Sequence, residues 1–356
     1  MAKGCEVLVN AAPDPTLAQP SRVIVTEAVG ASTTYALYYD FHLENGDFPM
    51  LADARLGPES ALALRVSDGD STSVLVAGPV TRQHLSIVNG GGGSILEVVG
   101  ADVLVELGRE AKVHVWPSTT DEDAIGSMLD AAGLAATVVL PSPVVHDEAK
   151  HALVQRESDL HLIRRLVRRN GCWLWLEYDR VTARPTVRVQ RPPVGAPSAL
   201  DLVIFGPQRN TDAVTIAWDV ERVVATDADA RDVFGASDID GSASRSPLGT
   251  LAKLGLADIV TKTRKARLSM PVDDAGDLLH RSGAALIEEG WFVQASVSVS
   301  ARRLKRVVRA NTVVTLHGAG SRHSGAYLVS HVVHRIDDDD HWMDVTLVRN
   351  GWNPTP

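Results

Sequence analysis

The sequence predicts a mixed, β-rich α+β fold in which two β units are joined by an α/β middle region. Three observations support this prediction. Short apolar and β-branched runs separated by turn residues fill residues 22–116, a capped helix leads into an aromatic strand within residues 157–179, and a second series of strands follows a helix near the C-terminus. A chain of 356 residues has room for two or three domains.

Residues 1–21 are expected to be a flexible lead-in because Asn10 and several prolines interrupt them, with one possible edge strand at Glu6–Val9. Residues 22–117 are expected to form the first β domain, a small barrel or sandwich. The glycine run at residues 89–93 lacks the Lys-Ser/Thr ending of a phosphate-binding loop, so it is interpreted as a long hairpin tip. The expected strands are Val23–Glu27, Tyr35–Leu43, Ala61–Ser67, Ser73–Gln83, Ser94–Gly100 and Lys112–Trp116.

Residues 118–200 are expected to form an α/β middle domain. Thr120 can cap a helix over Asp121–Ala132, whose acidic first turn suits the positive end of the helix dipole. A second helix is expected over Ser158–Asn170, because apolar residues recur there at helical spacing and Gly171 follows as a typical C-cap residue. Strands are expected at Cys172–Tyr178 and Thr186–Gln190.

The C-terminal part is expected to hold a β segment and loop-rich connection at residues 201–270, a helix and second β domain at residues 271–350, and a short tail at residues 351–356. In the connection, alternating residues predict a strand at Val214–Val220, whereas the polar segment Gly235–Pro247 is predicted to be mobile within a loop-like stretch. The later elements are expected at Asp273–Glu289 (helix), Trp291–Ser300, Val313–Gly318, Tyr327–His334 and Trp342–Arg349.

The composition is that of an ordinary globular protein, with 45% hydrophobic and 22% charged residues. A formal charge of −9 argues against a protein that binds nucleic acid through bulk charge. No apolar run reaches the roughly 20 residues of a membrane helix, and the N-terminus lacks the features of a secretory signal. Cys5 and Cys172 are interpreted as one mobile and one buried thiol, as expected in a reducing compartment.

No catalytic, cofactor-binding or metal-binding motif is apparent in the sequence. His146 and His151 do not have the spacing of a zinc-binding helix, and His331 and His334 should project to opposite faces of a strand. The acidic run Asp337–Asp340 lacks the glycine and distal glutamate of a calcium loop, so it is interpreted as a solvated hairpin tip, with a weak cation site as the alternative. We therefore expect a protein that is not an enzyme and needs no cofactor.

Two clusters of basic residues leave alternatives open. They are solvated surfaces in one interpretation, and in the other a positive face that meets an acidic partner subunit or lines a channel. Neither is interleaved with aromatic residues, so nucleic-acid contact is not expected. One cluster spans residues 302–309, and the other, a possible subunit interface, consists of Arg164, Arg165, Arg168 and Arg169.

The segment at residues 157–179, ESDLHLIRRLVRRNGCWLWLEYD, combines several local signals in a fixed order. Ser158 and Asp159 cap a helix, Gly171 ends it, and Trp173 begins an aromatic strand. In this order the segment resembles the phage late control gene D family. That family shares the motif with contractile-tail baseplate hub proteins and with the N-terminal hub part of type VI VgrG spike proteins.

Residues 311–350 resemble the C-terminal barrel of the same family. The resemblance covers roughly residues 150–350 and extends to residues 20–120 only through the β pattern. Two departures stand out: Asp337–Asp340 replaces a turn that is usually glycine-rich, and the four helix arginines replace a patch that is usually acidic. The matching positions are Gly318, Gly320, Ser324, Gly325, Tyr327, Val329, His334, Trp342, Thr346, Arg349 and Asn350.

The resemblance implies a phage tail hub-like fold with two small β-barrel-like domains per subunit, in which the motif residues are structural. It implies a homotrimer that acts as a symmetry adaptor between a hexameric inner tube and a trimeric spike. The expected setting is the baseplate of a phage tail or contractile injection system, assembled in the bacterial cytoplasm.

The expected partners are an inner tube protein, baseplate wedge proteins and a separate spike or needle protein, since the sequence stops at Pro356 without a needle. Neither nucleic acid nor direct membrane insertion is expected. Two other function classes stay open. A β-rich cell-wall glycan hydrolase would need paired carboxylates in a cleft, and a carbohydrate- or receptor-binding tail module would need an exposed aromatic platform such as Trp173 or Trp342.

Overall fold

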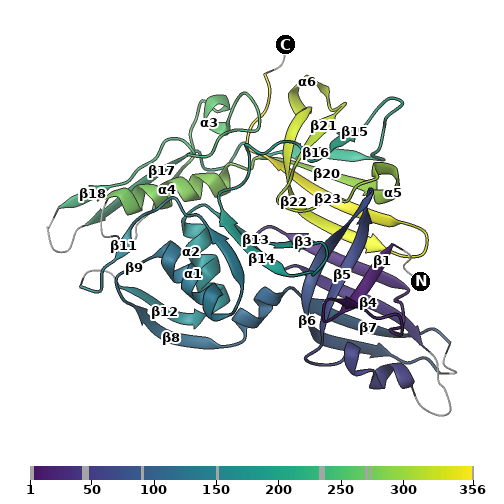
Figure 1. Ribbon diagram of the computed structural model, residues 1–356. Coiled ribbons are helices and arrows are strands. Elements are labelled where there is room, and N and C mark those ends of the chain that lie inside the picture. Colours follow the sequence, from purple (N-terminus) through teal and green to yellow (C-terminus); the bar gives the residue numbers. More distant parts are fainter. Residues whose placement is uncertain are drawn as a thin grey trace.

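A 13-stranded sheet dominates the computed structural model, accompanied by two- and three-stranded sheets and a few helices. Figure 1 shows two β units that adjoin one another and a middle region that packs helices against shorter strands. This confirms the β-rich α+β class. The structure describes residues 4–41, 48–89, 92–149, 152–231, 237–268, 272 and 275–354.

The first β unit is built from strands with alternating buried and exposed residues. In β4, Tyr35, Leu37 and Tyr39 point into the core, as expected for a sheet with one solvated face. Short 3-10 helices lie at Pro49–Ala52 (η1), Ala54–Leu56 (η2) and Val103–Gly108 (η3). The strands are β1 (Cys5–Val9), β2 (Ala12–Pro13), β3 (Arg22–Ala28), β4 (Thr34–Phe41), β5 (Ala61–Asp68), β6 (Ser71–Ser86) and β7 (Ser94–Ala101).

The structure corrects the expectation of a flexible lead-in, while the strand considered possible at Glu6–Val9 is present as β1. Strand β1 pairs along its whole length with β5, from Cys5 opposite Val66 to Val9 opposite Leu62. The apolar residues of β1 face the core, and Cys5 is buried rather than mobile. The prolines that suggested flexibility follow this strand.

The expected hairpin around the glycine run is present, because Ser86 of β6 pairs with Ile95 of β7.

The middle region contains two helices packed on short strands. Apolar faces of α1 and α2 enclose a core with β13 and β14. Strand β8 was expected in the first β unit, but it pairs with β12 of the middle region. The elements are β8 (Ala111–Trp116), β9 (Thr119–Thr120), α1 (Asp121–Ala131), β10 (Ala135–Val138), β11 (Val145–His146), β12 (Leu153–Ser158), α2 (Asp159–Arg169), β13 (Trp173–Tyr178) and β14 (Pro185–Gln190).

The second β unit is the C-terminal part of the large sheet. Its hairpin β22–β23 closes at Ile336 opposite His341, so the run Asp337–Asp340 is a hairpin tip, as expected. Its strands are β15 (Asp201–Val203), β16 (Val214–Trp218), β20 (Val293–Ser300), β21 (Val313–His317), β22 (Gly325–Ile336) and β23 (His341–Arg349). Helices in this part are α3 (Leu256–Ile259), α4 (Ala275–Glu289), α5 (Ala301–Leu304) and α6 (Gly320–His323).

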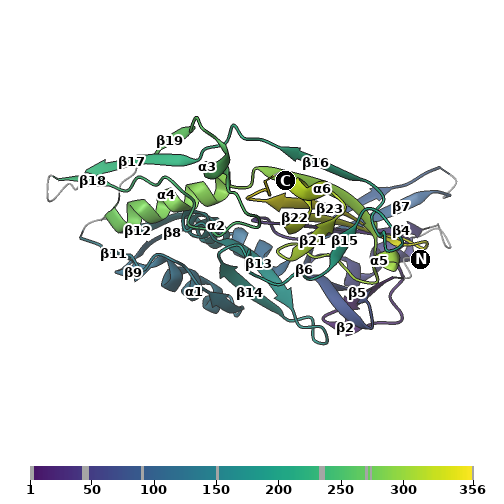
Figure 2. The same cartoon turned by 90° about the horizontal axis from the view of Figure 1, so that it is seen from above.

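The loop-like stretch expected around Gly235–Pro247 contains one further strand and is flanked by two others. Strand β17 (Ala225–Arg231) pairs with β18 (Asp238–Asp240) and with β19 (Lys265–Leu268), and this small sheet packs on α4 (Figures 1 and 2). Part of the segment predicted to be mobile is therefore paired. Some expectations lie outside the described residues: the strand end at 42–43, glycines 90–91, His151, residues 235–236, the helix start at 273–274 and tail residues 355–356.

The two β units are joined edge to edge, which the sequence did not predict. Strand β3 of the first unit pairs antiparallel with β22 of the second, from Ala28 opposite His331 to Val23 opposite Ile336. We call this β3–β22 boundary the seam. One hydrophobic core contains residues of both units. No helix in the described part of the chain has the length and apolar character needed to cross a membrane.

Candidate functional site

The capped helix of the sequence motif is present as α2. Ser158 is its N-cap residue, and its Oγ accepts a hydrogen bond from the backbone N–H of His161 at 3.4 Å. Asp159 does more than begin the helix: its carboxylate accepts hydrogen bonds from Lys112 Nζ at 2.5 Å and Gln155 Nε2 at 2.7 Å. Asp159 therefore ties α2 to the β8–β12 ribbon.

Gly171 ends α2 at the point where α4 approaches most closely. Its φ of +64° lies in the left-handed region. A Cβ at this position would lie 2.8 Å from Ile287 Cδ1 and 3.0 Å from the Cα of Ala284. Both the backbone conformation and the proximity of α4 require glycine, so the motif glycine sets the spacing between the two helices.

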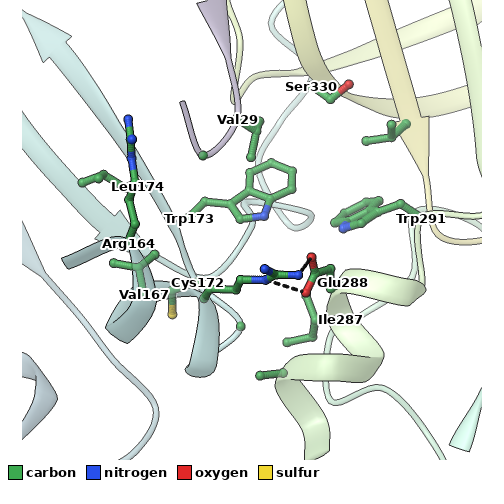
Figure 3. A pocket seen from close by; sticks show the side chains of 15 residues that line it. Val29, Arg164, Val167, Cys172, Trp173, Leu174, Ile287, Glu288, Trp291 and Ser330 are labelled. Atoms are coloured by element: carbon green, nitrogen blue, oxygen red, sulfur yellow. Dashed lines mark hydrogen bonds and ion pairs between the residues drawn. The ribbon is translucent and has the colours of Figure 1, made fainter. Parts of the chain in front are cut away.

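Beside this contact lies a cleft of about 470 Å³, bounded by α2, β13, α4 and the turn after β3 (Figure 3). Trp173 and Trp291 line it with ring centroids 5.5 Å apart. Val29 and Ile287 make further apolar walls. Glu288 is the only carboxylate among the described lining residues, and it is bound by an arginine rather than free. The cleft is thus mainly an apolar joint between the middle region and the two β units.

The four arginines of α2 do not form one free basic surface. Arg164 donates to Ser32 Oγ at 3.0 Å and lines the cleft. Arg165 donates to Glu157 Oε1 at 2.7 Å, and the exposed Arg168 donates to Glu288 Oε1 at 2.7 Å. The fourth, Arg169, turns inward. The sequence placed all four on one polar face, but each has its own partner within the chain.

Arg169 belongs to a buried cluster that joins α1 to α2. Its Nε donates to Asp121 Oδ2 at 2.6 Å, and Asn170 Nδ2 donates to the same oxygen at 2.7 Å. His146 Nε2 lies 2.8 Å from the other carboxylate oxygen. Burial, reinforced by the nearby charge of Arg281, lowers the pKa of Arg169 to about 10. This arginine is an internal brace and offers no charge to a partner.

The C-terminal motif residues surround a second buried arginine. Arg349 is 1% exposed, and its Cζ lies 5.1 Å from the ring centroid of Tyr327. The Tyr327 hydroxyl donates to the carbonyl of His323 at 2.8 Å. Gly325, with φ +126°, leaves room for the guanidinium, since its Cβ would lie 3.1 Å from Arg349 Nη2. Gly318 and Gly320 also have positive φ values, +89° and +74°.

Of the remaining motif residues, Val329, His334, Trp342 and Thr346 lie on the hairpin β22–β23, and Ser324 and Asn350 directly flank it. His334 is fully buried and contacts His341 and Glu27. Trp342 is half-buried on β23. The described residues contain no group of three or more histidine, cysteine or carboxylate side chains arranged to hold a metal ion. In these contacts the motif residues pack and orient their neighbours.

Sequence reasoning missed the cleft itself. Glu288 was placed correctly at a helix end, but Trp291, expected to begin a strand, lies two residues before β20. Nothing in the spacing of the two residues indicated that they face α2. Their distance from Trp173 along the chain exceeds 100 residues. One sequence signal for the cleft was available: Trp173 and Trp291 each follow shortly after the end of a helix.

Comparison with solved structures identifies the fold. The 43 kDa tail protein of prophage MuSo2 from Shewanella oneidensis has a TM-score of 0.70 at 14% identity, covering 98% of both chains. A tail protein from Neisseria meningitidis MC58 has a TM-score of 0.68 at 12% identity, covering 99% of both. These likenesses confirm the tail-protein fold expected from the motif.

A third similar structure is an E. coli protein described as a component of the type VI secretion system that resembles the T4 bacteriophage tail proteins gp27 and gp5. It has a TM-score of 0.59 at 11% identity, covering 98% of this chain and 79% of that one. No curated protein sequence matches the chain. The specific assignment to the late control gene D family stays a prediction.

A family model provides a more direct relationship. It is described as the Alg8 N-terminal domain, a description that names a domain and no activity, and it matches residues 3–338. The match runs from before β1 to the tip of the β22–β23 hairpin, so it includes the first β unit, the middle region and the second β unit as far as β22. The chain therefore belongs to the Alg8 N-terminal domain family.

Proposed function

We propose that this chain is a structural baseplate hub of a phage tail or contractile injection system. In this proposal it is a homotrimeric adaptor between a hexameric inner tube and a trimeric spike. The single observation that supports it most is the agreement of the fold with two tail proteins over 98–99% of both chains. The proposed hub domains are the two β units, expected at residues 22–117 and 271–350, with β8 assigned instead to the middle domain and β1, β15 and β16 added to the β units.

The geometry suits a symmetry adaptor. Each subunit carries two β units, so three subunits around an axis would present six, matching a hexameric tube on one side and a trimeric spike on the other. Because the two units share one sheet, force applied to one passes to the other through backbone hydrogen bonds rather than through a linker. The motif residues would hold this frame rigid, and none would take part in chemistry.

The partners follow from the same proposal: an inner tube protein, a separate spike or needle protein and baseplate wedge proteins. Assembly would take place in the bacterial cytoplasm, and the finished subunit would lie within the baseplate. The exposed side of α2, with Arg165 and Arg168, is the proposed subunit interface, whereas Arg169 is excluded from it because it is buried against Asp121.

The site gives less support to the other function classes. A glycan hydrolase needs two carboxylates facing the scissile bond, but the described walls of the tryptophan cleft contain one, already paired with Arg168. A glycan-binding module needs an exposed aromatic platform. Trp173 packs against Trp291, and Trp342 is half-buried. We therefore propose a role without catalysis.

Mass measurement by light scattering tests the proposal on the full chain, alone and mixed with the spike protein from the same operon. We expect three copies of the 38.1 kDa chain per particle in at least one of the two samples, with the mass of the spike added in the mixture. Electron microscopy of that particle should show a ring with six similar lobes. A monomer in both samples, or cleavage of purified cell-wall glycan by the chain alone, would overturn the proposal.

A further inference from the structure

A buried cluster of ionisable side chains lies on the seam between the two β units. Glu27 belongs to β3 of the first unit, and His334 and His341 belong to β22 and β23 of the second. Their exposed fractions are 4%, 0% and 7%. Ionisable groups this deeply buried are costly unless they are paired, so the contacts among them decide how stable the seam is.

Glu27 is held mainly by Arg309. Its Oε1 accepts a hydrogen bond from Arg309 Nε at 2.6 Å and lies 3.2 Å from His334 Nε2, while its Oε2 accepts from the backbone N–H of Ala310 at 3.0 Å. Burial raises the pKa of Glu27, but the charge of Arg309 and the hydrogen bonds lower it more, so the net pKa lies below its ordinary value. The carboxylate is therefore ionised at neutral pH.

Arg309 extends the cluster across to β6. Its guanidinium donates to the carbonyls of Val74 at 2.8 Å and Leu75 at 3.0 Å, and to Ser73 Oγ at 3.0 Å. One side chain from the second β unit thus binds two strands of the first. Among these partners, only Glu27 carries a negative charge that balances Arg309. A proton added to either imidazole therefore gives the cluster a net positive charge.

The two imidazoles share a single hydrogen bond. His334 Nδ1 lies 3.0 Å from His341 Nε2, a distance that fits one proton between the two nitrogens. If both rings were protonated, two N–H groups would point at each other across this gap. Burial, followed by the charge of His334, lowers the pKa of His341 to about 3.

The carboxylates near the pair, Asp340 and Glu27, favour a protonated His341, but burial and the charge of His334 outweigh them, and both carboxylates are already bonded to other groups. Asp340 is the remaining carboxylate beside His341, but its Oδ1 accepts from the backbone N–H of His341 at 2.8 Å and its Oδ2 accepts from Ser300 Oγ at 2.6 Å. Arg302 Nε also lies 3.9 Å from Asp340. Glu27 is already bonded to Arg309. A second imidazole proton would therefore leave a buried net positive charge without a new partner.

We propose that this cluster makes the seam an acid-responsive joint. The imidazole pair holds at most one shared proton between its two nitrogens. Uptake of a second proton there separates β22 from β23 and weakens the pairing of β22 with β3. The joint would be closed at neutral pH and would loosen in acid before the middle region does. The inference concerns one subunit and does not depend on the proposed trimer.

Hydrogen exchange measured on the full chain at pH 7.5 and pH 4.5, corrected for intrinsic rates, tests this inference. His341 has a pKa near 3 when buried and an ordinary value of 6.5 when exposed, so at pH 4.5 it takes up a proton only when the seam opens. For His341 alone, this raises the equilibrium constant for opening of the seam about a hundredfold at pH 4.5. We expect this increase for amides of β3 and β22, and a much smaller one for β13. The same amides in His341→Gln should change less than about threefold, because glutamine keeps a hydrogen bond and takes no proton.

The matched control is His84→Gln on the exposed part of β6, which should behave like the natural protein. If His341→Gln fails to fold, NMR titration of the natural protein decides the matter: His341 should stay neutral down to about pH 4. Titration of His341 near pH 6.5 with the seam amides still protected would overturn the inference. So would an equal acid response in His341→Gln and the natural protein.

Discussion

Single residues fix the close approaches in this fold, and glycine and arginine do so in different ways. Gly171 permits two helices to meet because it has no Cβ, whereas Arg309 binds two strands through hydrogen bonds and Arg349 fills buried space against Tyr327. The contribution of such a residue to stability can be tested by substituting it and, as a control, a residue of the same type in different surroundings.

Gly171→Ala should destabilise the chain more than Gly133→Ala. Both glycines follow a helix and have positive φ values, +64° and +69°. Nothing lies within 4 Å of a Cβ at Gly133, whereas a Cβ at Gly171 would meet Ile287 at 2.8 Å. Backbone strain alone costs about 1 kcal/mol, and overpacking adds about 1–3 kcal/mol. Urea unfolding of both variants measures the difference, and equal losses would contradict the steric argument.

Glu27→Gln should cost far more than Glu288→Gln, although each glutamate binds one arginine. Loss of the Glu27 charge leaves Arg309 half-buried without a carboxylate, and breaking a buried pair costs about 3–5 kcal/mol. The Glu288–Arg168 pair is exposed on both sides, and such pairs contribute at most about 1 kcal/mol. Thermal or urea unfolding at pH 7.5 gives both values. A similar small loss for both would mean that water reaches the seam.

At the scale of elements, the capped helix and most strands of the two β units could be predicted, because their signals are local. Ser158 caps α2 as expected, and strands such as β4 and β23 alternate cleanly between buried and exposed residues. The polar strands β17 and β19 were not predicted because their exposed sides carry charged residues. Lys265 faces Asp227 at 3.2 Å across them, so the sequence resembles a loop.

The positions of β8 and of the tryptophan cleft could not be predicted for a different reason. Whether β8 pairs within the first β unit or with β12 depends on contacts made far along the chain. The cleft likewise depends on α4 approaching Gly171. Periodicity predicts what an element is but not which element it meets.

The exposed side of α2 yields a prediction about assembly. Arg168→Glu should abolish or weaken the proposed trimer, because this side is the proposed interface, while leaving the stability of the subunit nearly unchanged. Arg188→Glu is the matched control, since Arg188 is a surface arginine on β14 paired with Glu177 at 2.9 Å. Light scattering and urea unfolding should be measured on both. Normal assembly of Arg168→Glu would remove α2 from the interface.

At the scale of the whole molecule, the shared sheet and core predict that both β units unfold together. Cys5 reports on the first unit, since burial raises the pKa of its thiol to about 12 and protects it from reagents. All seven tryptophans lie from Trp116 onward and report on the rest. In a Cys172→Ser background, thiol labelling and tryptophan fluorescence should show the same urea midpoint. Two separate midpoints would show that the seam couples the units only weakly.

The seam also has a consequence for synthesis on the ribosome. Strand β3 emerges early, yet its neighbour β22 begins at Gly325, so almost the entire chain must be made before β3 gains its second partner. Until then β3 presents an open, apolar edge of the kind that recruits other nascent chains. Messages truncated before residue 325 should therefore yield aggregates, and efficient production should depend on chaperones that shield this edge during translation.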